Sequence, residues 1–254
     1  HEVKTAITAL AVVGVGGIMV AGMLNTPPEN VVMASYATTL EGRMTTQRLN
    51  AELALDKLDG AVIEAGETFS FNKVVGTWSR SDGYRKAPVS FNGQLIWTWG
   101  GGVCQTSTTL YNAMLLAGLD LVERNRHRFA PGYVAAGRDA AVAYSNIDLR
   151  FRNPYPWPVT IHAETANGRL VCTVSGKGKP SESISVVTKL DDVRRPETLV
   201  DNLGGVGGRV MNPGKAGYSV TTYRVWRSPA GERREMLSKD TYPPMEKVVR
   251  RGDG

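Results

Sequence analysis

The sequence predicts an α+β fold in which helices pack on antiparallel β-hairpins, with a hydrophobic N-terminal helix and a small β-rich C-terminal tail. Two segments carry apolar residues at helical spacing, and several short segments alternate polar and apolar residues between turn signals. Strands and helices do not alternate as in βαβ units, which argues against a parallel sheet. With 254 residues, 42% hydrophobic and 21% charged, the chain is long enough for one large or two small domains and is not wholly disordered.

The N-terminal segment is uncharged from Thr5 to Leu24, and Lys4 precedes it. Its length is about that of a bilayer core. We therefore expect a membrane anchor or the end of a signal peptide within residues 1–30, with a buried core helix as the alternative. Both membrane interpretations place the rest of the chain outside the cytosol.

The central segment, 33–180, is predicted to form one domain. Its first helix is capped by Thr45 or Thr46, and Gly60 ends it. The other elements expected here are a strand at 33–40, a strand–turn–strand unit at 61–72, a long ordered loop at 76–103, a helix at 105–117 and a hairpin at 159–175 that turns at Asn167 and Gly168.

The C-terminal segment, 181–254, is predicted to be a β-rich extension. A glycine-rich stretch at 204–217 precedes a final hairpin. The strands of this hairpin are expected at 218–227 and 232–239, and Pro229, Ala230 and Gly231 form the turn between them.

The candidate nucleophile is Cys104, which follows Gly100, Gly101 and Gly102 at the start of the second helix. Helix N-termini favour negative charge, so a thiolate is stabilised there. The glycines allow a substrate to approach the backbone closely and leave N–H groups free to face an oxyanion. The alternative is that Cys104 is buried and fills a small space in the core.

The second cysteine, Cys172, lies on a predicted strand with Leu170 and Val174 on the same face. We expect it to be an inert core residue. A disulfide between Cys104 and Cys172 is the alternative, because the chain is predicted to lie outside the cytosol.

A thiol nucleophile requires a base, and His127 is the preferred candidate because it follows the helix in a polar, arginine-rich loop. His162 is expected to be exposed on its strand. Asp139 could orient His127, and Arg138 could bind a substrate carboxylate. The alternatives are a surface histidine and a structural Arg–Asp pair, and the three arginines 124, 126 and 128 favour a solvated face.

Trp99, Gly101, Gly102 and Gln105 complete the candidate oxyanion and substrate-binding residues, although core packing is an alternative explanation for the tryptophan. The sequence has no GxSxG, HExxH or Walker motif, and we expect no metal and no cofactor. The net charge of +6 suits an anionic surface such as a bacterial envelope and is weak evidence for nucleic acid, which we do not expect as a partner.

Seven segments, taken in their order along the chain, resemble the VanW family, which is named for an accessory gene of some vancomycin-resistance clusters. They are SYATTLEGR, GAVIEAGETFSFNKVVG, SDGYRKAP, GGGVCQTSTTLYNAMLLAGL, ERNRHR, GRDAAVAY and DLRFRN. The resemblance covers about 33–176, and it implies a bacterial cell-envelope protein that is membrane-anchored or exported.

Some members of that family are described as L,D-transpeptidases, so the resemblance implies a cysteine-dependent enzyme that forms 3–3 cross-links between peptidoglycan stem peptides. Cys104 would be the acylated nucleophile and His127 the proton carrier. Three alternatives remain open: a non-catalytic peptidoglycan-binding module, a cysteine peptidase or amidase, and a structural envelope protein.

Overall fold

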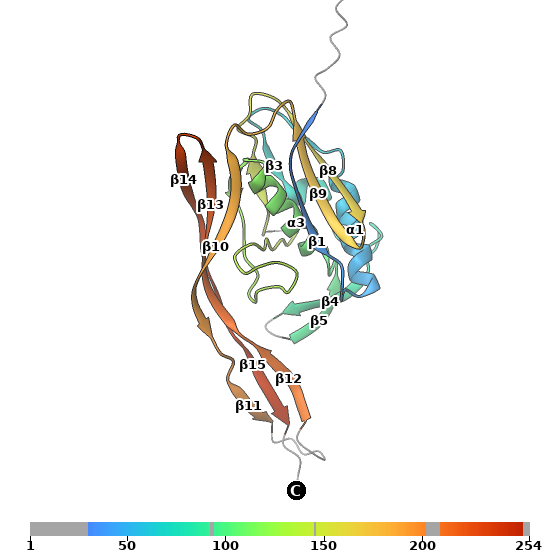
Figure 1. The fold of residues 1–254 in the computed structure, drawn as a ribbon. Helices are drawn as coiled ribbons and strands as arrows, with labels where there is room; N and C mark the ends of the chain where they lie inside the picture. Colours follow the sequence, from blue (N-terminus) through green and yellow to red (C-terminus); the bar gives the residue numbers. More distant parts are fainter. Residues whose placement is uncertain (1–29, 92–93, 145, 202–208, 251–254) are drawn as a thin grey trace, which may run out of the picture.

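The computed structural model describes residues 30–91, 94–144, 146–201 and 209–250. Antiparallel β-sheet dominates this part of the chain, which contains fifteen strands and three helices (Figure 1). The helices are α1 (Thr45–Leu58), α2 (Phe71–Val75) and α3 (Val103–Leu116). The strands are β1 (Val31–Thr39), β2 (Val62–Ile63), β3 (Thr68–Ser70), β4 (Lys86–Phe91), β5 (Gln94–Trp99), β6 (Asp120–Glu123), β7 (Arg150–Arg152), β8 (Val159–Ala166), β9 (Arg169–Gly176), β10 (Ser183–Arg194), β11 (Thr198–Asp201), β12 (Arg209–Lys215), β13 (Gly217–Ser228), β14 (Gly231–Tyr242) and β15 (Met245–Arg250).

The predicted α+β class, with helices packed on hairpins and a small β-rich tail, is therefore wrong. The difference comes mainly from the C-terminal segment, where two three-stranded sheets replace the expected tail. Their strand orders are β10-β13-β14 and β11-β15-β12. Only the last hairpin carries a clear turn signal, and β10 exposes most of its side chains, so the usual apolar alternation of a half-buried strand is weak there.

The N-terminal body contains the four-stranded sheet β1-β9-β8-β2, the three-stranded sheet β3-β7-β6 and the hairpin β4-β5. Helix α3 packs against β1, β9 and α1, and its middle is fully buried (Figure 1). The predicted hairpin at 159–175 is confirmed, because β8 and β9 pair across Asn167 and Gly168. The predicted loop at 76–103 is wrong in part, since β4 and β5 form a hairpin within it.

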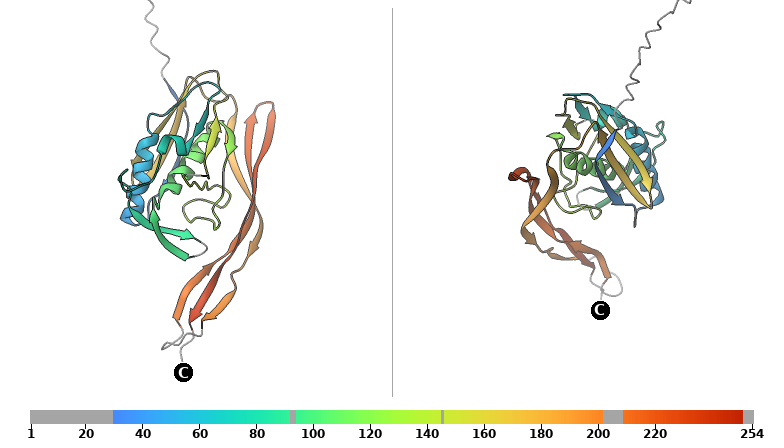
Figure 2. Two further views of the ribbon diagram at one scale, coloured as in Figure 1. Left: turned by 180° about the vertical axis from the view of Figure 1, so that it is seen from behind. Right: turned by 45° about the horizontal axis from the view of Figure 1, so that its top comes forward.

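The long strands β10, β13 and β14 run beside the N-terminal body (Figure 2). Arg224 of β13 fastens them to it. Its side chain is 2% exposed, and its Nη1 donates to the Leu119 carbonyl oxygen at 2.6 Å while its Nη2 lies 2.7 Å from Glu235. The C-terminal strands therefore share buried polar contacts with the body.

The predicted membrane segment, residues 5–24, lies outside the described residues, as does most of the glycine-rich stretch. Within the ranges given above, none of the helices is both long and apolar enough to cross a bilayer.

Replacing Arg224 tests this attachment. We expect Arg224→Ala to lower the free energy of unfolding by about 2–3 kcal/mol, because the change leaves a buried carbonyl without its charged donor. Urea denaturation measures this loss. The matched control is Arg227→Ala, whose ion pair with Glu232 is exposed and is expected to contribute less than about 1 kcal/mol. Equal losses in the two variants would contradict the attachment.

Candidate active site

Glycines position the cysteine at the beginning of α3. Gly102 is the N-cap with φ 118°, and a Cβ there would collide with the Gln47 carbonyl oxygen. A Cβ on Gly101 would lie 2.9 Å from the Ala87 carbonyl oxygen. Only glycine fits such close approaches, so the run of glycines allows the helix to begin against α1 and β4. Cys104 follows as the second residue of the helix and is half-buried.

The polar residues after the cysteine lie in the interior of the body rather than on its surface. Ser107 donates to the Ala140 carbonyl oxygen at 2.7 Å, and Thr108 accepts from the Ala140 N–H at 3.0 Å. On another face, Thr106 donates to the Ala51 carbonyl oxygen at 2.8 Å. These hydroxyls fasten α3 to α1 and to the segment 139–142, which passes beside Cys104.

A backbone bridge between Asn125 and Ala141 brings the two loop segments of the site together. The Ala141 N–H donates to the Asn125 carbonyl oxygen at 2.7 Å. As a result His127 lies next to Asp139, and the Val142 carbonyl oxygen lies 3.4 Å from the Cys104 Sγ.

The side chain of His127 lies between those of Cys104 and Asp139 and interacts with both. The His127 Nδ1 lies 2.7 Å from Asp139 Oδ2, which leaves Nε2 as the ring nitrogen available to Cys104. The bond to Asp139 places the Nδ1 proton and orients the ring. The three predicted residues are thus adjacent, in the order that a nucleophile, its base and an orienting acid would require.

The Asp139 carboxylate is fully buried and accepts four hydrogen bonds. Oδ2 accepts from the His127 backbone N–H and its Nδ1, both at 2.7 Å. Oδ1 accepts from Arg124 Nη2 at 3.0 Å and from the Tyr242 hydroxyl at 2.5 Å. Burial alone would raise the pKa of Asp139, but the bonds to His127 and the charge of Arg124 outweigh it and lower the pKa to about 2. Asp139 is therefore a carboxylate at neutral pH.

His127 and Cys104 stabilise each other's charged forms. Burial acts to lower the pKa of His127, but its hydrogen bonds to Asp139 and Cys104 and the charges of both raise the pKa to about 9. Burial acts to raise the pKa of Cys104, yet the hydrogen bond and charge of His127 bring that pKa below its ordinary value. A thiolate beside an imidazolium is the reactive state of a cysteine nucleophile.

Arg124 links this triad to the C-terminal strands. Its side chain is 4% exposed, and its Nη1 lies 2.6 Å from Asp240 of β14. The expectation that the three arginines form a solvated face is wrong for Arg124 and fits Arg126 and Arg128, which are exposed. The sequence analysis missed Asp240, Tyr242 and their contacts with Arg124, because no local motif connects residues more than 100 positions apart.

The remaining predicted residues are distributed differently. Gln105 is buried on another side of α3, where its Nε2 donates to the Thr39 carbonyl oxygen at 2.7 Å. Arg138 lies two helical turns from Cys104, bonded to Asn112 at 2.6 Å and stacked on Tyr36. The structure thus does not bring either side chain to the sulfur. Trp99 is 37% exposed on β5, on the hairpin that leads into the glycines.

The cysteines form no disulfide, so that alternative is wrong. Cys172 is fully buried, and burial raises the pKa of its thiol, as expected of an inert core residue. His162 is exposed, as predicted.

A family model described as VanW like protein matches residues 46–175, half of the chain. The chain belongs to the VanW family. The predicted resemblance is confirmed, and Cys104, His127 and Asp139 all lie within the matched VanW residues. Tyr242 and Asp240, which hold Asp139 and Arg124, lie beyond them.

Two curated relatives match part of this chain. The protein YoaR of Bacillus subtilis is 39% identical over 142 residues, which cover 56% of this chain and 47% of YoaR. The vancomycin B-type resistance protein VanW of Enterococcus faecalis is 33% identical over 109 residues, covering 41% of this chain and 40% of that protein. The match thus spans less than half the length of either relative.

Two solved structures are similar to a smaller part of the chain. The G5 domain of IgA1 protease has a TM-score of 0.21 at 20% identity and covers 29% of this chain and 94% of that domain. The G5 domain of HP0197 has a TM-score of 0.18 at 18% identity and covers 28% of this chain and 95% of that domain. At these TM-scores the similarity assigns neither a fold nor a ligand to this chain.

The pKa shifts predict how Cys104 responds to alkylation. Because His127 lowers the thiol pKa, iodoacetamide should modify Cys104 readily at pH 7, where an ordinary thiol with a pKa of about 8.5 is mostly protonated. In His127→Ala the burial remains and the stabilising hydrogen bond and charge are lost. The thiol pKa should then rise, and the rate at pH 7 should fall by about tenfold or more.

Peptide mapping by mass spectrometry checks this result, with Cys172 as an internal control that stays unmodified in both proteins. The thiolate–imidazolium pair would be contradicted if the alkylation rate of the wild-type protein rose with pH at the midpoint of an ordinary thiol and if His127→Ala left that midpoint unchanged.

Proposed function

We propose that this VanW-family protein is a cysteine acyltransferase of the bacterial cell envelope, and that it acts as an L,D-transpeptidase on peptidoglycan stem peptides. The observation that supports the proposal is the alignment of Cys104, His127 and Asp139 at the beginning of a helix. The family membership supports the choice of cell-wall peptide as substrate. Membrane attachment through residues 5–24 is part of the same proposal.

The first step forms a thioester. The Cys104 thiolate attacks the carbonyl carbon after the third residue of a donor stem, and the carbonyl electrons move to oxygen. As the tetrahedral intermediate collapses, the C–N bond breaks, and the His127 imidazolium gives its proton to the departing amine, which leaves as D-Ala. His127 is then neutral and acts as the base of the second step.

The second step transfers the acyl group to an amine of a neighbouring stem. The amine attacks the thioester carbonyl, neutral His127 accepts the amine proton, and the C–S bond breaks to release the thiolate beside the imidazolium. The product is a 3–3 cross-link, and the enzyme returns to its starting state. Asp139 remains a carboxylate throughout and stabilises the imidazolium.

The oxyanion is proposed to bind at the N-terminus of α3. The Val103 and Gln105 N–H groups donate to the carbonyl oxygens of Gly100 and Gly102 at 3.0 and 2.9 Å. Among the described groups of this first turn, the Cys104 N–H remains as a donor for the oxyanion, supported by the helix dipole. Gly101 and Gly102 contribute by letting the substrate approach the backbone closely. The Gln105 side chain takes no part in binding the oxyanion.

The β4-β5 hairpin is proposed to form one wall of the substrate site. Trp97 and Trp99 project from the same face of β5, where they are 58% and 37% exposed. Lys86 of β4 lies over the Trp99 ring at 5.7 Å. An exposed aromatic pair beside the glycines can pack against the donor stem or its sugar.

Product analysis distinguishes the transferase from its rivals. Incubation with purified tetrapeptide-stem muropeptides should yield 3–3 dimers and free D-Ala, and Cys104→Ala should yield neither. Liquid chromatography with tandem mass spectrometry identifies both products. Cleaved stems without dimers would indicate a peptidase rather than a transferase, because water would then be the acyl acceptor. No turnover, with binding unchanged by Cys104→Ser, would favour a binding module.

A further inference from the structure

Arg43 is a half-buried cation in the turn between β1 and α1. Its backbone is fixed on both sides: its N–H donates to the Leu40 carbonyl oxygen at 3.1 Å, and its own carbonyl oxygen accepts from Arg48 Nε at 3.1 Å. The guanidinium carbon lies 4.6 Å from the centroid of the Tyr133 ring. A cation stacked on an aromatic ring in this way is held in one orientation.

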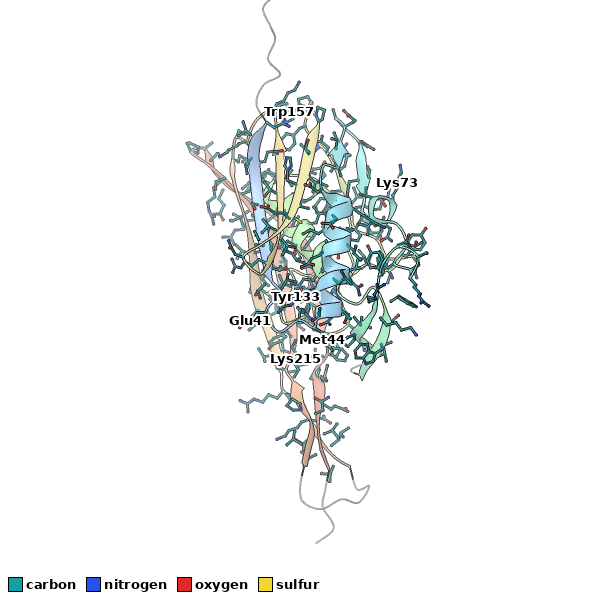
Figure 3. The ribbon with its side chains drawn as sticks, turned by 90° about the vertical axis from the view of Figure 1, so that its right-hand side faces the viewer. Glu41, Met44, Lys73, Tyr133, Trp157 and Lys215 are labelled. Atoms are coloured by element: carbon teal, nitrogen blue, oxygen red, sulfur yellow. The ribbon has the colours of Figure 1, made fainter. Side chains whose placement is uncertain are left out.

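This stack lies beside the nucleophile. The Tyr133 hydroxyl donates to the Cys104 carbonyl oxygen at 3.3 Å, so Arg43, Tyr133 and Cys104 form a continuous contact. In Figure 3, Tyr133 and Met44, the residue after Arg43, are both labelled at the lower end of α1. The β1–α1 turn therefore forms part of the edge of the site.

The guanidinium of Arg43 has no hydrogen-bond acceptor among the described residues. The other three buried or half-buried arginines of the body and its attachment each have one. Arg124 binds Asp139 and Asp240, Arg138 binds Asn112, and Arg224 binds Glu235.

Burial lowers the pKa of Arg43, and Tyr133 alone acts against it, with no carboxylate taking part. A half-buried cation loses part of its hydration, and an anion that binds there restores the lost interaction. The planar fork of a guanidinium matches a carboxylate, which it binds through two parallel hydrogen bonds.

The proposed reaction supplies such a group. When Cys104 attacks the carbonyl after the third residue of a tetrapeptide stem, the leaving residue carries a free carboxylate. That carboxylate lies one residue beyond the scissile carbonyl, and an extended residue spans about 3.5 Å. In a stem that is one residue longer, the terminal carboxylate would lie one residue farther from the scissile carbonyl. A side-chain carboxylate elsewhere on the stem would not lie at a fixed distance from that carbonyl.

We infer that Arg43, held by Tyr133, binds the terminal carboxylate of the residue that leaves and thereby selects stems that end one residue after the scissile bond. This inference rests on the proposed function and adds a specificity determinant to it. The role that the sequence analysis gave to Arg138 is thus assigned to Arg43, since Arg138 is bonded away from the sulfur.

Binding to the Cys104→Ala variant tests the inference without any turnover. Isothermal titration calorimetry would compare a tetrapeptide stem with a free C-terminal carboxylate and the same peptide with a C-terminal amide. We expect the free acid to bind about 10- to 100-fold more tightly. In Cys104→Ala/Arg43→Gln the two peptides should bind equally, at the affinity of the amide, and Arg43→Lys should recover part of the preference.

The matched control is Arg80→Gln, which removes an exposed arginine and should leave the preference intact. Equal affinity of acid and amide for Cys104→Ala would overturn the inference, as would a preference that survives Arg43→Gln. In both cases wild-type protein that still forms the 3–3 product would leave the proposed function standing. Failure to bind either peptide, together with no turnover, would overturn both.

Discussion

The Asp139 carboxylate is fully buried, and its four hydrogen bonds come from the His127 loop, from Arg124 and from Tyr242 at the end of β14. A buried charge without partners is strongly destabilising, so these groups must be in place before Asp139 can occupy its position. The bond from Asp139 to Nδ1 orients the imidazole, and the carboxylate raises the pKa of His127, which in turn lowers the pKa of Cys104. A single carboxylate therefore joins the His127 loop to Arg124 and to the end of β14.

This dependence gives the C-terminal strands a role in the site. Tyr242 and Asp240 belong to a segment outside the VanW match. Tyr242 nevertheless donates to Asp139, and Asp240 pairs with Arg124. Arg224 fastens the same strands to the body near Leu119. A change in how β13 and β14 pack on the body would thus alter the orientation of His127 through Asp139 and Arg124.

Local signals in the sequence predict the elements that fold from neighbouring residues. The spacing of Ala51, Ala54, Leu55 and Leu58 predicts α1, and the Asn167-Gly168 turn predicts the β8-β9 hairpin. The β4-β5 hairpin and strands β10, β11, β12 and β15 were missed, because their pairing depends on partners far along the chain or lacks a strong turn signal. The predicted fold class was wrong for this reason.

The same distinction holds for the site. Glycines before a cysteine, and a histidine and an aspartate in polar loops, predict Cys104, His127 and Asp139 by residue type. Gln105 points away from Cys104 because of the rotation of α3, and Arg138 is held by Asn112 of the same helix. Periodicity predicts neither arrangement, because it does not fix the rotation of a helix to within one residue. Arg43, Tyr133 and Tyr242 reach the site only through tertiary contacts, so no motif indicates them.

The central claim is that Cys104 is a nucleophile activated by His127 and Asp139. Intact-mass spectrometry of the protein, after incubation with purified tetrapeptide-stem muropeptides, tests it most directly. We expect a covalent adduct with the mass of the acyl donor minus D-Ala, absent in Cys104→Ala and strongly reduced in His127→Ala. No adduct on the wild-type protein, with Cys104 titrating as an ordinary thiol, would contradict the account.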